Sequence, residues 1–182
     1  KGDKTQLFDL KGKTMIPGLI EGHAHLYGIG RNLSEVDLVG TKSYNEVIQR
    51  VAIKAKSTPK GEWIIANGWH HDKWVTQPTL INGYPTNKLL SAAVPDHPVV
   101  LVHASGHNII INHKAMDIAD INSKTPQPDG GEIILDLNGK PTGILNETAT
   151  DLVYKYLPDP TKEKVKEEIT LALEECFKNG IT

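Results

Sequence analysis

Two histidines separated by a single residue, His23 and His25, are side chains whose types and spacing suit metal chemistry. In an extended strand, residues two apart project from the same face with Cα atoms roughly 6.5 to 7 Å apart, so their imidazoles can converge on one ion. Imidazole nitrogen is a preferred ligand of zinc and of neighbouring transition metals. A bare H-x-H also arises by chance or as a hydrogen-bonded structural pair, so the spacing alone leaves both interpretations open.

The elements around this pair place it at the end of a strand. Residues 14–20 have the pattern of a buried strand that carries Pro17-Gly18 and leads directly into the histidines. A helix is predicted over residues 43–56, because Ser43 and Glu46 form a capping box ahead of an apolar stripe. Further strands are predicted at 63–67, 99–103, 107–112, 133–137 and 142–145, and further helices at 86–93, 147–156 and from Pro160 to Gly180. The last two strands flank Asn138-Gly139, a strong hairpin signal, so the fold class is mixed α+β with partly antiparallel strands.

Composition and charge narrow the classes of function. The chain has 182 residues, of which 38% are hydrophobic and 23% charged, and its net charge is −2. Because the basic residues are scattered, we expect neither nucleic acid nor an anionic membrane surface as a partner. The longest apolar runs are too short to cross a bilayer, and the single cysteine, Cys176, excludes an internal disulfide. The chain begins at Lys1 and stops at Gly180-Ile181-Thr182, so we expect a piece of a longer protein, with its compartment undetermined.

The residues around the two histidines form a specific motif, which reads Met15-Ile16-Pro17-Gly18-Leu19-Ile20-Glu21-Gly22-His23-Ala24-His25-Leu26. This motif resembles the end of the first barrel strand in the amidohydrolase superfamily, where a P-G-(apolar)2-D-x-H-x-H pattern supplies two metal ligands. The chain departs from that pattern by placing Glu21 where aspartate is usual. The departure should matter little, because neither acid is expected to be a ligand.

Further blocks follow in order along nearly the whole chain: Gly61-Glu62-Trp63-Ile64, Gly68-Trp69-His70-His71-Asp72-Lys73-Trp74, Val94-Pro95-Asp96-His97-Pro98-Val99, Ser105-Gly106-His107, Gly130-Gly131-Glu132-Ile133, Gly139-Lys140-Pro141-Thr142-Gly143 and Gly180-Ile181-Thr182. They resemble the amidohydrolase-3, or YtcJ-like, branch, which includes N-substituted formamide deformylase. In that family a small α+β domain is inserted after the first strand of a (β/α)8 barrel. The resemblance therefore implies an N-terminal remnant and first barrel strand in 1–30, the inserted domain in 31–157, and the first barrel helix and the start of the next strand in 158–182.

The resemblance also implies a mechanism. One or two divalent metals, with zinc the expected ion, lie at the mouth of the barrel, polarise a carbonyl and bind a hydroxide that attacks it. His23 and His25 would hold one metal. The other ligands and the catalytic acid–base group come from later barrel strands, so no catalytic residue is expected within this chain and the chain alone should be inactive. The substrates implied are small molecules with C–N bonds in amides, formamides or related N-acyl compounds.

Other side chains have weaker functional interpretations. His107 belongs to the Ser-Gly-His block, which the resemblance places facing the barrel mouth, so it is a candidate for the substrate pocket. His70, His71 and Trp74 occupy a loop that could line the same pocket, although ordinary loop packing explains each of them singly. The remaining histidines read as structural or solvent-facing; they are His97, His103 and His113. Glu147 is predicted to open a helix, where an acid favours the helix dipole.

Two classes of function therefore stay open. In the first, the chain is part of a metal-dependent hydrolase whose partner is the remainder of its own barrel, and oligomerisation of that enzyme is left open. In the second, it is a free-standing module for binding or assembly in which H-x-H is incidental. Sequence beyond Thr182 with more barrel strands, together with near-stoichiometric metal in the full-length protein, would favour the first class.

Overall fold

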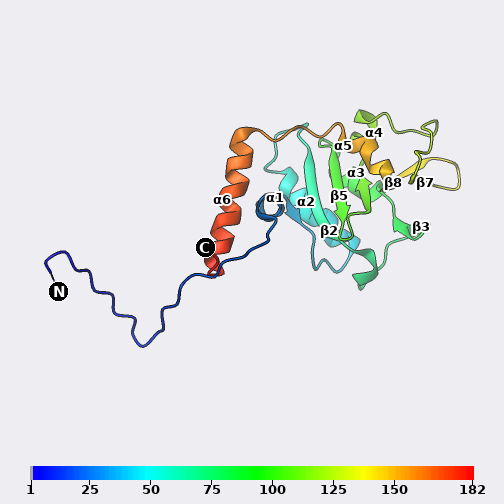
Figure 1. Cartoon of the computed structure of the whole chain (residues 1–182). Helices are drawn as coiled ribbons and strands as arrows, with labels where there is room; N and C mark the ends of the chain where they lie inside the picture. The colour runs from blue at the N-terminus through cyan, green and yellow to red at the C-terminus, as the bar shows by residue number, and fades with distance from the viewer. Residues whose placement is uncertain (1) are drawn as a thin grey trace.

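The computed structural model describes residues 2–182, and its centre is a six-stranded mixed sheet (Figure 1). The strand order is β1-β2-β5-β6-β8-β7, in which β1, β2 and β5 run parallel and the other three continue antiparallel. The bounds are β1 Val36–Asp37, β2 Ile64–Trp69, β5 Val99–His103, β6 Asn108–Ile111, β7 Gly131–Leu135 and β8 Pro141–Glu147. A separate two-stranded sheet pairs β3 (Leu80–Ile81) with β4 (Tyr84–Pro85). The fold is therefore mixed, as the sequence predicts.

The central strands are apolar on both faces, because helices cover the sheet from both sides. Consecutive residues of β5 alternate between two hydrophobic clusters: Val99 and Leu101 join one, and Val100 joins the other. The first cluster contains α2 (Tyr44–Ala55) and α3 (Lys88–Ala93), and the second contains α4 (His113–Ile118) and α5 (Asp151–Tyr154). Burial on both faces is the reason for the uninterrupted apolar runs of these strands.

Two local predictions are confirmed at the level of single hydrogen bonds. Ser43 caps α2, because its hydroxyl accepts a hydrogen bond from the backbone N–H of Glu46 at 3.2 Å. The β7–β8 hairpin turns at Asn138-Gly139, where Gly139 adopts a φ of +74° and the Asp136 carboxylate accepts backbone N–H groups at 2.8 and 2.9 Å. The short elements η1 (His71–Lys73) and η2 (Thr148–Thr150) follow β2 and β8.

Two helices that are far apart in the sequence, α1 (Leu26–Ser34) and α6 (Lys162–Lys178), pack against each other beside the sheet (Figure 1). Their backbones approach closely at Gly30, where a Cβ atom would lie 1.7 Å from the carbonyl oxygen of Glu168. The buried Glu168 side chain accepts a hydrogen bond from Ser34 at 2.9 Å. The contact joins the helix that follows the N-terminal segment to the helix that precedes the C-terminus.

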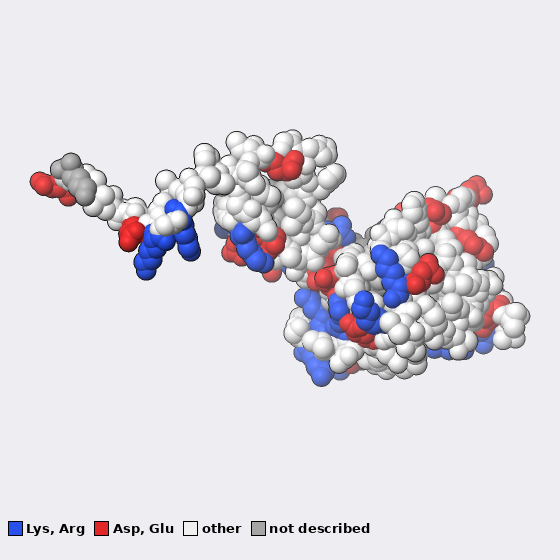
Figure 2. Space-filling view, turned by 90° about the horizontal axis from the view of Figure 1, so that it is seen from below, with Lys and Arg blue, Asp and Glu red and all other residues white. Residues whose placement is uncertain are grey.

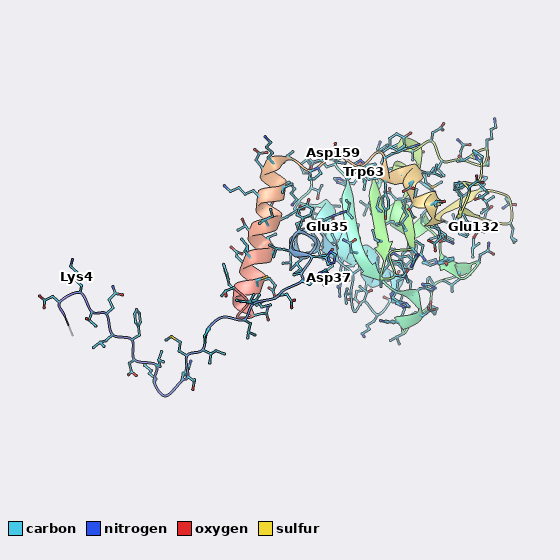
Figure 3. The ribbon with its side chains drawn as sticks, in the orientation of Figure 1. Lys4, Glu35, Asp37, Trp63, Glu132 and Asp159 are labelled. Atoms are coloured by element: carbon cyan, nitrogen blue, oxygen red, sulfur yellow. The ribbon has the colours of Figure 1, made fainter. Side chains whose placement is uncertain are left out.

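The segment before α1 differs from its prediction. The predicted strand at 14–20 forms only a single parallel bridge, between Leu19 and Ile181, with backbone hydrogen bonds of 2.8 and 2.9 Å. A strand needs neighbours for its backbone groups, and among residues 2–182 only the segment at Ile181 supplies one. The residues before it run as an extended segment that leads away from the sheet, with Lys4 near its far end (Figure 3).

A second correction concerns Glu147, which was expected to open a helix over 147–156. It is instead the last residue of β8, with φ +50° and ψ −129°, and only Thr148–Tyr154 is helical, as η2 followed by α5. The pairing of β8 with β7 extends through Glu147, which is in register with Gly131. This strand pairing, rather than the local helix pattern, therefore determines the conformation of Glu147.

Acidic and basic side chains are interspersed on the surface that Figure 2 displays, without a large region of one sign. Within residues 2–182, no helix combines the length and the apolar character that crossing a membrane requires.

Candidate functional site

His23 and His25 lie where the chain leaves its bridge with Ile181 and enters α1. Leu19 pairs with Ile181 in parallel, and His25 occupies the N-cap position of α1 with no side-chain capping bond. The Glu21 carboxylate accepts the backbone N–H of His23 at 2.9 Å, so this acid shapes the turn between the bridge and the helix. The acid of the motif therefore has a structural role here.

The two imidazoles have a geometry that fits a shared metal ion. Their ring centroids are 5.6 Å apart, the ring planes are inclined by 78°, and both side chains are exposed. Two imidazoles on one tetrahedral zinc, with Zn–N bonds of about 2.0–2.1 Å, place their ring centroids about 5 Å apart. Small side-chain rotations would bring both nitrogens to one ion, and two nitrogen donors suit zinc better than magnesium or calcium.

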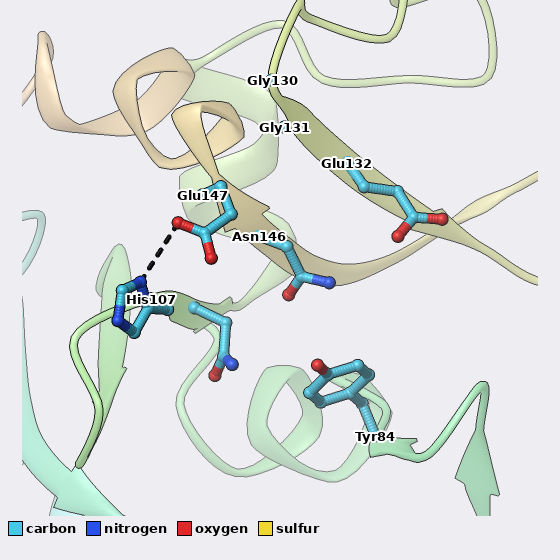
Figure 4. Close-up of a pocket in the computed structure, with 8 residues that line it drawn as sticks. Tyr84, His107, Gly130, Gly131, Glu132, Asn146 and Glu147 are labelled. Carbon is cyan, nitrogen blue, oxygen red and sulfur yellow. Dashed lines mark hydrogen bonds and ion pairs between the residues drawn. The ribbon is translucent and has the colours of Figure 1, made fainter.

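His107 lies at a second place, in a hollow of about 570 Å³ beside the start of β6 and the end of β8 (Figure 4). Its Nδ1 is 3.1 Å from Glu147 Oε2, and its backbone carbonyl accepts the Glu147 N–H at 2.7 Å. Glu147 holds the positive φ that L-residues rarely adopt, which costs on the order of 1–3 kcal/mol. Strain of this kind collects at functional sites, because the surrounding structure must keep the side chain in one position.

The floor of this hollow is a row of polar side chains on adjacent strands. Asn108 pairs with Asn146 across β6 and β8, and Asn146 pairs with Glu132 across β8 and β7. The Oδ1 atoms of both asparagines are buried and have no hydrogen-bond partner among the described residues. Two free amide acceptors beside two carboxylates suit a small polar ligand that donates hydrogen bonds.

A third group joins His70, His71 and His103. One ring nitrogen from each lies within 4.8 Å of the others. His70 and His71 come directly after β2, and His103 ends β5, where it is in register with Trp69. Because β2 and β5 are parallel, their carboxyl ends meet at one edge of the sheet, where α/β folds place their ligands.

The environment of His103 holds its imidazole neutral. Burial, the larger cause, and the neighbouring His70 and His71 together lower the pKa of His103 to about 4. Its Nδ1 contacts the Ser105 hydroxyl at 2.8 Å and the Ser105 backbone N–H at 3.1 Å, so Ser105 fixes the ring. His103, expected to be structural or solvent-facing, is therefore not solvent-facing.

The structure places the candidate pocket residues in two adjoining groups, because Tyr84 lines the hollow of His107 and its ring centroid lies 5.5 Å from that of His71. His70 and His71 lie with His103, whereas His107 lies in the hollow with Glu147. Trp74 is 5% exposed and stacks on Tyr44 with ring centroids 5.6 Å apart, which makes it part of the core below His71. The sequence analysis did not propose Asn108 and Asn146 as site residues, because they are brought together only by the pairing of β6 with β8.

Comparison with known proteins gives concordant matches. The model of the amidohydrolase family matches residues 6–182. The chain is 35% identical over 179 residues to YtcJ of Bacillus subtilis (strain 168), by its name a candidate amidohydrolase, covering 98% of this chain and 33% of that protein. It is 33% identical over 151 residues to N-substituted formamide deformylase of Arthrobacter pascens, covering 82% and 27%.

Solved structures agree with these relatives. A metal-dependent hydrolase of uncharacterized function from Pyrococcus horikoshii OT3 superposes with a TM-score of 0.61 at 28% identity, covering 91% of this chain and 30% of that one. The chain thus spans about a third of the length of the proteins that it matches.

Proposed function

This chain belongs to the amidohydrolase family, and from that premise we propose that it is part of a metal-dependent hydrolase acting on C–N bonds of amides, formamides or related N-acyl compounds. The observation that carries the proposal is the H-x-H pair, whose ring centroids lie 5.6 Å apart directly after a parallel bridge. Similarity to N-substituted formamide deformylase supports the substrate class.

In this proposal His23 and His25 hold one divalent ion, with zinc as the expected metal. When bound, such an ion acts as a Lewis acid toward a carbonyl oxygen and activates water. The chain contributes two neutral imidazoles, and Glu21 keeps their turn in place through the His23 backbone N–H. Both imidazoles are exposed here, so the remaining ligands and the substrate have access to them.

We further propose that residues 1–30 and 158–182 belong to a (β/α)8 barrel and that 31–157 form an inserted α+β domain. Three features support this division. Leu19 and Ile181 pair in parallel, as successive barrel strands do, and α6 precedes the second of them. The two hydrophobic clusters draw their members from residues 36–157, and the two buried residues of α6, Glu168 and Ala172, lie outside both clusters.

Exposed apolar side chains support the proposal that residues 1–30 and 158–182 pack against further protein. Leu19, Ile20 and Phe177 are 60%, 87% and 62% exposed around the Leu19–Ile181 bridge. Because Leu19 and Ile20 are consecutive in an extended segment, they project to opposite sides, so apolar side chains are uncovered on both sides of this bridge. The remainder of the same barrel is the partner that continues the strand pairing begun at this bridge.

His107 is proposed as a substrate-pocket residue together with Glu147, because the pair borders a hollow of about 570 Å³. The imidazole and the carboxylate would orient a polar group of the substrate by hydrogen bonds. His71 adjoins this hollow through Tyr84, which lines it and whose ring centroid lies 5.5 Å from that of His71, whereas Trp74 packs in the core beneath His71.

The test uses His23→Ala and His25→Ala in the full-length protein, with the exposed His113→Ala as the matched control. We expect metal content and turnover of N-substituted formamides and N-acyl amides to fall together in the first two and to be unchanged in the control, with the far-UV circular dichroism preserved in all three. Normal metal content and normal turnover in His23→Ala would refute the metal role of the pair.

The chain of 182 residues is expected to show no turnover, because two imidazoles leave most of a coordination sphere unsupplied. Metal-dependent hydrolysis by this chain above the level of its His23→Ala variant would contradict that expectation.

A further inference from the structure

Three histidines converge at the carboxyl end of the parallel pair β2–β5, and neither histidine of the H-x-H pair belongs to this group. Their ring centroids are 4.8 Å (His70–His103), 5.7 Å (His71–His103) and 6.2 Å (His70–His71) apart. Each separation is within about an ångström of the value of about 5 Å that two imidazoles on one tetrahedral zinc require. His23 and His25 are not members of this group, whose nitrogens lie within 4.8 Å of one another.

Each of the three rings also has a buried nitrogen that lacks a hydrogen-bond partner among the described residues. His70 Nδ1, His71 Nδ1 and His103 Nε2 are buried atoms without a hydrogen-bond partner among the described residues. Buried polar atoms are normally paired, so three orphaned ring nitrogens in one cluster are exceptional. The His103 side chain is only 9% exposed, which leaves its Nε2 no access to bulk water.

The surroundings supply what metal-bound imidazoles require. A ligating histidine usually donates its other ring N–H to an oxygen, and the Ser105 hydroxyl lies 2.8 Å from His103 Nδ1. Because the Ser105 backbone N–H donates to His103 Nδ1 at 3.1 Å, the metal-free ring carries its proton on Nε2, as a buried N–H without an acceptor. Metal binding at Nε2 would move that proton to Nδ1, where the Ser105 hydroxyl oxygen can accept it. Asp72 brings a carboxylate to 3.6 Å from His71 Nε2 and 3.9 Å from His70 Nδ1.

We propose that His70, His71 and His103 form a second metal site, separate from the H-x-H site, that takes a borderline divalent ion such as Zn²⁺. Three imidazole donors select zinc and its neighbours over magnesium or calcium. The ion ties the segment after β2 to the end of β5 and so holds η1 in position. Three protein ligands leave a coordination place for water or for a fourth donor.

The site is tested in a His23→Ala/His25→Ala background, which removes the other proposed metal site. Zn²⁺ titration by calorimetry is expected to show one equivalent bound, and Co²⁺ should give the visible absorption of a tetrahedral ion. Because the Trp69 and His103 ring centroids are 4.6 Å apart, bound Cu²⁺ should quench tryptophan emission. No Zn²⁺ binding by this background at about 100-fold the protein concentration would overturn the proposal.

Variants in the same background separate a metal site from aromatic packing. Ser105→Ala should weaken Zn²⁺ binding by about 10- to 100-fold, and His71→Ala or His103→Ala should weaken it more. His113→Ala, the matched control, should bind as the background does. Since His103 is buried and its variant could misfold, the more exposed His70→Gln provides the second test, read together with far-UV circular dichroism. Equal affinity in His70→Gln, His71→Ala and the control would refute the site.

Discussion

The helix α1 contains two glycines for which the structure predicts opposite effects of the same substitution. At Gly30 an added Cβ would lie 1.7 Å from the Glu168 carbonyl oxygen and 2.4 Å from its carbonyl carbon. Both are backbone atoms, so relief requires α1 and α6 to separate by more than an ångström. Overpacking of this kind costs about 1–3 kcal/mol, partly offset by about 0.5–1 kcal/mol from replacing glycine in a helix. Because the clash is with backbone atoms, its cost lies at the upper end of this range, and Gly30→Ala should lower the free energy of unfolding by about 2 kcal/mol.

Gly28→Ala is the matched control, because the nearest atom to its added Cβ would be His25 Cβ at 3.7 Å, an ordinary contact. Only the helix-propensity gain remains there, so the free energy of unfolding should rise by about 0.5–1 kcal/mol. Urea unfolding followed by far-UV circular dichroism measures both variants. Changes of the same sign, or a Gly30→Ala variant as stable as the unsubstituted chain, would refute the α1–α6 packing described above.

Three further predictions concern polar groups. Glu147→Gly should be more stable than Glu147→Ala by about 0.5–2 kcal/mol in urea unfolding, since both lose the carboxylate and only alanine keeps the strained φ; the reverse order would refute the strain. Asn112→Ala should lower the free energy of unfolding by about 3–5 kcal/mol in the same assay, because this side chain is fully buried and makes four hydrogen bonds to backbone groups at 2.8–3.1 Å. A decrease below about 1 kcal/mol would contradict a structural role for these hydrogen bonds. In the metal-free chain the folded-state pKa of His103, about 4, lies below the ordinary 6.5. The contribution of His103 to the free energy of unfolding is thus complete above pH 6.5 and is lost as the pH falls toward 4. Thermal unfolding across this window should show the free energy of unfolding falling by on the order of 1–3 kcal/mol, and His103→Gln should reduce that fall.

The sequence predicts the regions of this fold where local signals and tertiary packing agree. The capping box at Ser43 predicts the start of α2, and the apolar run from Val99 predicts β5 with the bounds that the structure shows. In both places the local pattern and the buried neighbours favour the same conformation.

Other elements depend on contacts that the sequence does not reveal. The strands β1, β3 and β4 are two residues long and exist only through their neighbours. The sequence pattern does not predict helix α1, because Gly28 and Gly30 lower its helix propensity. The same Gly30 allows α6 to approach closely. Glu147 illustrates the opposite error, because an acid ahead of a helix is a common N-terminal signal and the β7–β8 ladder overrides it.

The candidate sites divide in the same way. His23 and His25 are recognisable because their spacing along one segment predicts that they converge. The convergence of His103 with His70 depends on the parallel pairing of β2 with β5 and on the irregular register that places Trp69 opposite His103. No spacing along the chain encodes that register. Histidines directly after two apolar strands are the only sequence signal, and it becomes informative once the pairing is known.

The two histidine groups share one structural principle. A parallel pair of segments brings the residues that follow each of them to the same edge, whatever their separation in sequence. His23 and His25 follow Leu19, which pairs in parallel with Ile181, and His70 follows β2, which pairs in parallel with β5. Imidazoles at such an edge are close enough to share an ion while their strands remain fixed by backbone hydrogen bonds. The second group is built on pairing within residues 64–103, so its metal binding should persist when the first pair is replaced, and this independence separates the two proposals experimentally.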